Sequence, residues 1–140
     1  MKIVRGASAN WKGAGKTGVG KISTQSTTLD NAQLSFNTRF ADGVGTNPEE
    51  LVGAALAGCI TMKMSFVLNA AGFTADNIDT TAKVTLDTDL GKISIINVEI
   101  TASVPEISEE EFQKAAIETK DNCMISQLYS CEIVVNASLV

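Results

Sequence analysis

Three cysteines, Cys59, Cys123 and Cys131, are the residues of this chain best suited to covalent chemistry. A free cysteine is most often a small buried hydrophobic side chain, and it becomes a nucleophile only where its thiolate is stabilised. Cys123 lies at a predicted helix start, where backbone N–H groups favour a thiolate. Cys131 begins a predicted strand, and we interpret it as part of the core.

Cys59 lies in the middle of a predicted helix and therefore gains no stabilisation from a helix end. A reactive Cys59 requires a nearby cation. The chain has two arginines, Arg5 and Arg39. Arg39 falls on a predicted strand, on the face opposite Phe36 and Phe40, and an isolated arginine in such a place is usually a solvated charge. These residue types alone leave both interpretations of Cys59 open, a buried side chain or a reactive thiol.

The composition excludes several function classes. The chain has no histidine, which removes Ser–His and Cys–His couples, a His-ligated haem and a His-containing zinc site. The cysteines form no CxxC pair, so the case for a metal site is weak and a general thiol–disulfide oxidoreductase is disfavoured. A net charge of −5 argues against nucleic acid and against an anionic membrane surface. The segment 13–17 ends like a phosphate-binding loop, but Asn10 stands where that motif requires glycine.

One long helix between Asn47 and Gly72 is predicted to organise the fold. Asn47 is a suitable N-cap, Pro48 suits the first helical position, and Glu50 stands where the partner of a capping box is expected. Gly72 suits the left-handed residue that ends a helix. Residues 51–62 carry no charge and are rich in alanine and glycine, which predicts a thin helix that is buried all round. Lys63 and the small residues make the stretch too weakly hydrophobic for a membrane span.

The remaining elements follow from alternation and turn residues. Strands are predicted over 2–11, 20–24, 33–40, 78–86, 92–104 and 131–140, and short helices after Ser108 and over 123–129. A change of phase near Ile96 and Asn97 predicts a bulge. The order of strands and helices, with hairpin connections, indicates an α+β fold with antiparallel sheets around a long buried central helix, in one domain over residues 1–140.

The helix after Ser108 carries the clearest start signal of these shorter elements. Ser108 is a predicted N-cap with Glu111 as its capping-box partner. Four residues at helical spacing are predicted to face inward: Phe112, Ala115, Ala116 and Thr119. The start of the chain has no signal-peptide pattern, so a cytoplasmic, reducing compartment is expected, with free thiols.

Several segments combine into a more specific motif. They are Phe-Asn-Thr-Arg-Phe at 36–40, Gly-Thr-Asn-Pro-Glu-Glu-Leu at 45–51, and Ala-Ala-Leu-Ala-Gly-Cys at 54–59. Further matching segments are 71–74, 78–82, and Cys123 followed by Ser126 and Gln127. Together these segments resemble the OsmC/Ohr family of organic hydroperoxide peroxidases over almost the whole chain. The context of Arg39 resembles the OsmC branch, the osmotically inducible protein C.

The resemblance implies a role for each of four residues. Cys59 matches the peroxidatic cysteine and Cys123 the resolving cysteine of the family. Arg39 and Glu49 match the charged pair that stabilises the peroxidatic thiolate, and assigning Glu50 to the capping box leaves Glu49 free for that role. Two residues depart from the family pattern: Gly58 stands where alanine is frequent, and Met124 stands where proline is common. Neither departure removes a chemical group.

The spacing of Glu49 and Cys59 sets a geometric condition on this assignment. Ten residues of one straight helix span roughly 15 Å, so the two side chains cannot meet within it. If both serve one site, either the helix breaks or they come from different subunits. The resemblance implies an intertwined homodimer with two sites at the interface, which meets this condition.

These observations lead to an expected activity and an alternative. The expected activity is thiol-dependent reduction of organic hydroperoxides through a Cys59 sulfenic acid and a Cys59–Cys123 disulfide, in defence against oxidative stress. It requires an external dithiol or lipoyl-type reductant and no bound cofactor or metal. Phe40, Met62 and Tyr129 are candidates for an apolar lining that favours alkyl substrates. The alternative is a small-molecule binding or redox-sensing protein of the same fold without peroxidase turnover.

Overall fold

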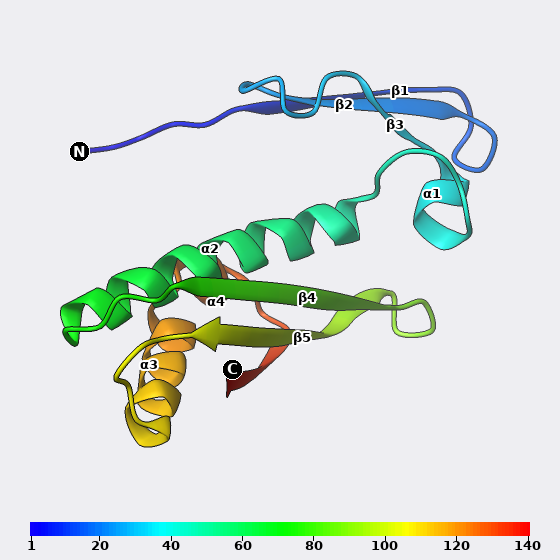
Figure 1. Cartoon of the computed structure of the whole chain (residues 1–140). Coiled ribbons are helices and arrows are strands. Elements are labelled where there is room, and N and C mark those ends of the chain that lie inside the picture. Colours follow the sequence, from blue (N-terminus) through cyan, green and yellow to red (C-terminus); the bar gives the residue numbers. More distant parts are fainter. The chain divides into compact units, whose positions relative to one another are not determined.

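The structure, a computed structural model, describes all 140 residues and divides into two compact units. The first unit comprises Met1–Leu51 and the second Val52–Val140. The boundary lies inside the longest helix, α2, which spans Pro48–Ala70 (Figure 1). The order of elements agrees with the predicted order except for one additional short helix before α2.

The first unit is built on a small antiparallel sheet in the order β1-β2-β3. Its strands are β1 (Ala7–Lys12), β2 (Val19–Thr24) and β3 (Ala32–Leu34), so β1 begins five residues later than predicted. Trp11 and Gly20 are paired across β1 and β2. A Cβ on residue 20 would come within 3.1 Å of the Leu34 Cβ and closer still to the indole ring. A glycine is therefore required opposite this tryptophan.

The predicted strand over residues 33–40 is wrong in its second half. After β3 the chain forms a short helix, α1 (Phe36–Phe40), which puts Arg39 on a helix and not on a strand. The Ser35 side chain accepts from the Thr38 N–H, and the Thr38 hydroxyl accepts from the Ser35 N–H at 2.9 Å. This reciprocal cap stabilises the first turn, and it outweighs the alternating pattern of apolar residues. Phe36 and Phe40 consequently stack at i and i+4, with ring centroids 4.8 Å apart.

Both ends of α2 are capped, but the start differs in detail from the predicted capping box. The Asn47 side-chain oxygen accepts from the Glu50 N–H at 2.8 Å, as expected for an N-cap. The Glu50 carboxylate accepts from the Thr46 hydroxyl and not from the backbone of Asn47, so the reciprocal half of the predicted capping box is absent. At the other end Gly72 adopts φ +91°, which agrees with the predicted left-handed residue.

The prediction that α2 is buried all round is wrong for this chain by itself. Residues on one side are buried, namely Gly53, Leu56, Ile60, Met64, Val67 and Leu68. On the other side, Met62 is 65% and Phe66 67% exposed. Within the second unit the helix packs on one sheet, which covers one stripe of its surface. By length and composition alone α2 could cross a membrane, but the core helix of a soluble protein meets the same criterion.

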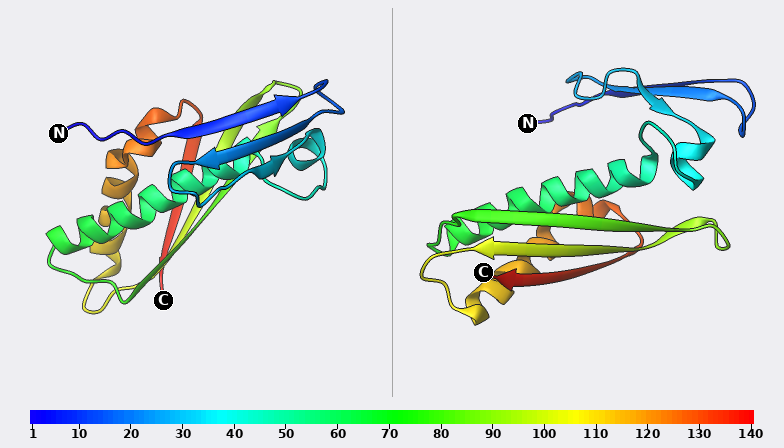
Figure 2. Two further views of the ribbon diagram at one scale, coloured as in Figure 1. Left: turned by 90° about the horizontal axis from the view of Figure 1, so that it is seen from above. Right: turned by 45° about the vertical axis from the view of Figure 1, so that its right-hand side comes forward.

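The second unit contains a three-stranded sheet in the order β4-β5-β6 (Figure 2). Strands β4 (Asn77–Asp87) and β5 (Lys92–Ser103) form the predicted hairpin. The closing strand β6 (Glu132–Leu139) runs parallel to β5, so the expectation of purely antiparallel sheets is wrong here. The bulge also lies earlier than predicted: Thr85 pairs with Ile95 and Leu86 with Ile93, which leaves Ser94 as the extra residue.

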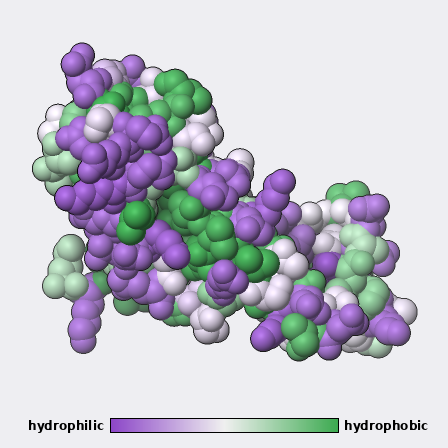
Figure 3. All heavy atoms as spheres, turned by 90° about the horizontal axis from the view of Figure 1, so that it is seen from below, coloured by the Kyte–Doolittle hydropathy of each residue, from purple (hydrophilic) through white to green (hydrophobic).

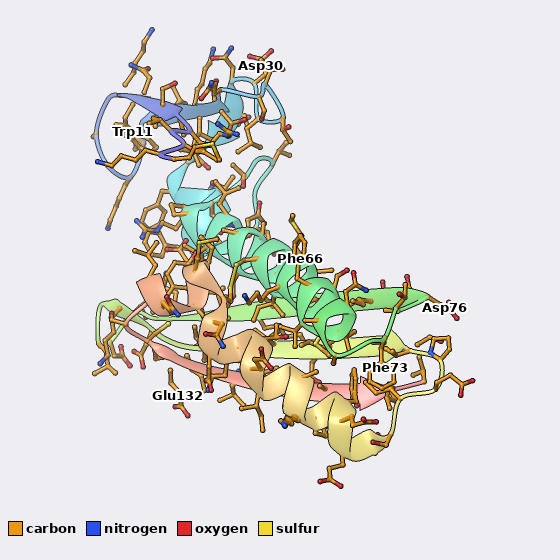
Figure 4. All side chains as sticks on the ribbon, turned by 90° about the vertical axis from the view of Figure 1, so that its left-hand side faces the viewer. Trp11, Asp30, Phe66, Phe73, Asp76 and Glu132 are labelled. Atoms are coloured by element: carbon orange, nitrogen blue, oxygen red, sulfur yellow. A yellow bond between two sulfur atoms is a disulfide. The ribbon has the colours of Figure 1, made fainter.

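Two further helices connect β5 to β6. They are α3 (Glu109–Asn122) and α4 (Met124–Leu128), and α2 and α3 lie over the same face of the sheet (Figure 4). The predicted capping box of Ser108 and Glu111 is confirmed, as are the four buried residues of α3. Phe112 is fully buried in a cluster with Met64 and Leu68 of α2. On the face drawn in Figure 3, an apolar band lies among hydrophilic residues.

We predict that Phe112→Ala lowers the free energy of unfolding by roughly 3–5 kcal/mol, because it leaves a cavity in this cluster. Ile117 lies on the same helix and is 64% exposed, so Ile117→Ala is the matched control and is expected to change stability by roughly 0.5 kcal/mol or less. Urea denaturation followed by circular dichroism measures both. Equal effects of the two substitutions would contradict the buried placement of Phe112.

Candidate active site

Cys59 and Cys123 form a disulfide in the second unit. Their Cα atoms are 6.2 Å apart, although 64 residues separate them in the sequence. Cys59 lies near the middle of α2, and Cys123 is the residue between α3 and α4. The expectation of free thiols is therefore wrong for this pair, whereas the bond between Cys59 and Cys123 that the family resemblance implies is present.

The cysteine pair lies at the edge of an apolar cluster. Cys123 is fully buried, and Cys59 is half-buried beside it. The cluster joins α2 to β5 and β6 through buried residues that include Leu56, Ile60, Ile96, Val98, Ile100 and Ile133. The predicted position of Cys123 at a helix start is confirmed: its sulfur accepts from the Ser126 N–H at 3.5 Å as the N-cap of α4.

Arg39 and Glu49 form an ion pair in the first unit. Arg39 donates from Nε at 3.0 Å and from Nη2 at 2.8 Å, both to Oε1 of Glu49. The Glu49 side chain is 11% exposed and the Arg39 side chain 44%. The guanidinium also lies over the Phe40 ring, 5.3 Å from its centroid. Arg39 therefore contacts both Glu49 and Phe40 and is not an isolated solvated charge.

The second carboxylate oxygen of Glu49 has no partner within the chain. Oε2 is buried and accepts no hydrogen bond, whereas Oε1 accepts two. An unpaired buried acceptor is unfavourable, and such atoms commonly mark a place where another molecule binds. The nearby Asn47 amide donates to the Thr38 carbonyl at 3.0 Å, which ties the start of α2 to α1. This contact holds α1, which carries Arg39, against the start of α2, which carries Glu49.

The two pairs of predicted site residues belong to different compact units. Arg39 and Glu49 lie in Met1–Leu51, and Cys59 and Cys123 lie in Val52–Val140. Helix α2 is unbroken over Pro48–Ala70, so the first of the two geometric conditions, a break between Glu49 and Cys59, is not met. No group of three or more His, Cys, Asp and Glu side chains is arranged to hold a metal ion.

Tyr129 is the residue of this region that sequence reasoning undervalued. We named it only as an apolar neighbour, but its hydroxyl donates to the Val52 carbonyl of α2 at 3.1 Å. Burial raises the pKa of the Tyr129 phenol, and a negative charge on Cys131 adds to the rise. Cys131 is the free cysteine and is half-buried, so its predicted core position is only partly met. The sequence feature that points to a specific role for Tyr129 is that it is the chain's sole tyrosine and lies close to Cys123.

The fold and the cysteine pair together define an α+β protein of the thiol-redox class, with a disulfide between a long helix and the crossover of a mixed sheet. Residues 41–138 match the model of the OsmC-like protein family, and the chain belongs to this family. It is 42% identical to Peroxiredoxin OsmC of Escherichia coli over 141 residues, which covers 99% of each chain. The family predicted from the sequence segments is therefore confirmed.

Solved structures show the same fold at low identity. An OsmC-like protein from Mycoplasma pneumoniae gives a TM-score of 0.77 at 17% identity, covering 100% of this chain and 99% of that one. The organic hydroperoxide resistance protein OhrB of Bacillus subtilis gives a TM-score of 0.65 at 22% identity, covering 96% of this chain and 98% of that one. The predicted α+β class and the long central helix agree with these folds.

We predict that the oxidised protein retains one free thiol per chain, because Cys131 is unpaired while Cys59 and Cys123 are bonded. Titration in denaturant should give one thiol before and three after reduction with a dithiol. In Cys131→Ser the counts should be zero and two. Finding a free thiol in oxidised Cys131→Ser would contradict the pairing.

Proposed function

We propose that this chain is a thiol-dependent peroxidase that reduces organic hydroperoxides to alcohols. The observation that carries the proposal is the Cys59–Cys123 pair, which joins two elements 64 residues apart. The assignment to the peroxidases also follows from 42% identity to Peroxiredoxin OsmC over nearly the full length of both chains. The preference for organic substrates is supported by the apolar cluster around the two sulfurs.

The reaction proceeds in two steps on the chain's own sulfur atoms. The Cys59 thiolate attacks one oxygen of the hydroperoxide, the O–O bond breaks, and the alkoxide leaves and takes up a proton to become the alcohol. Cys59 is thereby oxidised to a sulfenic acid. The Cys123 thiol then displaces the hydroxyl group, which gives the disulfide and one molecule of water. An external dithiol or lipoyl-type reductant returns both residues to thiols.

Arg39 and Glu49 assist the first step. Arg39 stabilises the Cys59 thiolate and then the alkoxide on which negative charge develops. Glu49 fixes the guanidinium through Oε1, and its unpaired Oε2 accepts from the O–H of the hydroperoxide. This arrangement gives the buried Oε2 the partner that the chain by itself does not supply.

An intertwined homodimer brings the two pairs of residues into one site. Arg39 and Glu49 of one subunit would act on Cys59 of the other, since ten residues of unbroken helix separate Glu49 from Cys59. The exposed Met62 and Phe66 support this assembly, because a second copy would cover them. In this proposal residues 1–140 form one domain of a cytoplasmic enzyme, without bound cofactor, that acts in oxidative and osmotic stress.

We predict that one equivalent of cumene hydroperoxide consumes two thiols per chain of the reduced protein, and faster than hydrogen peroxide does. Cys59→Ser should abolish this loss, and Cys131→Ser should preserve it. The measurement is stopped-flow mixing followed by thiol titration and intact-mass analysis. If wild-type thiols are not consumed, the chain is a binding or redox-sensing protein of the same fold and the proposed turnover is wrong.

We predict that Arg39→Met slows sulfenic acid formation by roughly 10²–10³-fold, the usual effect of removing a preorganised donor from a developing anion. Arg39→Lys should fall between this variant and wild type, because lysine keeps the charge but lacks the two-pronged contact with Glu49. Arg5→Met, which changes the chain's other arginine, is the control and should react at the wild-type rate. A wild-type rate in Arg39→Met would remove Arg39 from the mechanism.

A further inference from the structure

Helix α4 is attached to α2 at both of its ends. At its start, Cys123 is the N-cap of α4 and is bonded to Cys59. At its end, Tyr129 is the C-cap, and its hydroxyl donates to the Val52 carbonyl at 3.1 Å. Val52 and Cys59 are seven residues apart, which is two turns of α2, so both attachments lie along the same side of that helix.

We propose that Tyr129 is a positioning residue that keeps Cys123 close to Cys59 whenever the disulfide is open. The proposal rests on the proposed function for its catalytic consequence, though not for its physical basis. Opening the disulfide removes the attachment at Cys123 and leaves the one at Tyr129. The segment that carries Cys123 then remains docked on α2, which raises the effective concentration of its thiol at Cys59.

The hydrogen bond from Tyr129 to the Val52 carbonyl is well suited to holding Cys123 near Cys59. The Tyr129 ring packs against the apolar cluster that contains Leu56 and Cys123. Tyr129 also lines a cavity of about 510 Å³, and its hydroxyl supplies the directional contact to α2. Burial raises the pKa of the phenol, which keeps the hydroxyl a neutral donor throughout the pH range in which thiols ionise.

Docking of the segment that carries Cys123 on α2 matters because the Cys59 sulfenic acid can react in two ways. It condenses with the Cys123 thiol to give the disulfide and water, or it reacts with a second hydroperoxide. In the second reaction the sulfenic sulfur gains one oxygen, giving a sulfinic acid, and the hydroperoxide is reduced to the alcohol. The sulfinic acid is not returned to a thiol by a dithiol. A residue that favours condensation therefore protects the enzyme from inactivation by its own substrate.

The first test measures the equilibrium between the dithiol and disulfide forms, and it needs no peroxidase activity. Tyr129→Phe and Gln127→Met are made in full-length Cys131→Ser and equilibrated in dithiothreitol redox buffers. Gln127→Met is the matched control, because Gln127 also donates from the α4 segment to a backbone carbonyl, that of Asp121, but does not reach α2. Intact mass after alkylation gives the fraction of each form.

We expect Tyr129→Phe to lower the effective concentration of the two thiols by roughly three- to tenfold, the worth of one net hydrogen bond, and Gln127→Met to leave it unchanged. A purely structural role for Tyr129 would affect both redox forms alike and would leave the equilibrium at the wild-type value. That result, or an equal shift in both variants, would overturn the proposal. Circular dichroism and urea denaturation verify that each variant is folded.

The second test concerns the sulfenic acid directly. With excess cumene hydroperoxide, Tyr129→Phe should form sulfenic acid at the wild-type rate but accumulate roughly three- to tenfold more sulfinic acid per turnover, as measured by mass spectrometry. A wild-type fraction of sulfinic acid would count against the positioning role. If the wild-type chain does not react with hydroperoxide at all, the proposed function fails, while the dithiol equilibrium still decides whether Tyr129 positions Cys123.

Discussion

Parallel pairing of β5 and β6 is the constraint on which the second unit depends. Two parallel strands cannot be joined by a turn, because the chain must return to the starting end of the sheet before the second strand begins. Here the return path contains α3 and α4 and crosses the face of the sheet that α2 also covers. Cys123 lies on this return path, so the topology of the sheet brings it to α2.

Helix α2 then determines where the cysteines meet and what remains uncovered. One stripe of the helix packs on β4 and β5, and Cys59 lies at the edge of that stripe, half-buried. The opposite stripe is apolar but exposed at Met62 and Phe66. Within the second unit one sheet covers one side of this helix, and in our proposal a second copy of the chain covers the other apolar side. Earlier on the helix, the exposed small residues Ala54, Ala55 and Gly58 allow close approach of a neighbouring backbone.

Sequence patterns predicted the elements whose causes are local. The caps at Asn47 and Ser108, the β4–β5 hairpin and the buried face of α3 depend on residues within a few positions of one another, and the structure confirms them. The direction of β6 depends on the path of the chain through space, which alternation does not encode. Helix α1 was mistaken for a strand, because a serine–threonine cap outweighed an alternating apolar pattern.

The candidate site also combines features that the local sequence predicts with features that it does not. Residue types and spacing alone left Cys59 open between a core residue and a nucleophile, and the similarity to the OsmC/Ohr family was needed to pair it with Cys123. The structure adds contacts that spacing does not encode, because they join residues distant in sequence. Tyr129 and Val52, for example, are 77 positions apart. The pairing of Arg39 with Glu49 was expected from the family motif. The hydrogen bond from Asn47 to α1 and the contact of the Arg39 guanidinium with the Phe40 ring were not.

The long separation of the two bonded cysteines has a consequence for the unfolded chain. A cross-link that closes a loop of this length removes conformational entropy from the denatured state, which corresponds to about 4 kcal/mol of added stability in the loop-entropy model. The reduced chain lacks this contribution. Opening and closing one bond on the surface of α2 therefore changes the resistance of the whole second unit to heat and proteolysis, so that the lifetime of the protein depends on its redox state.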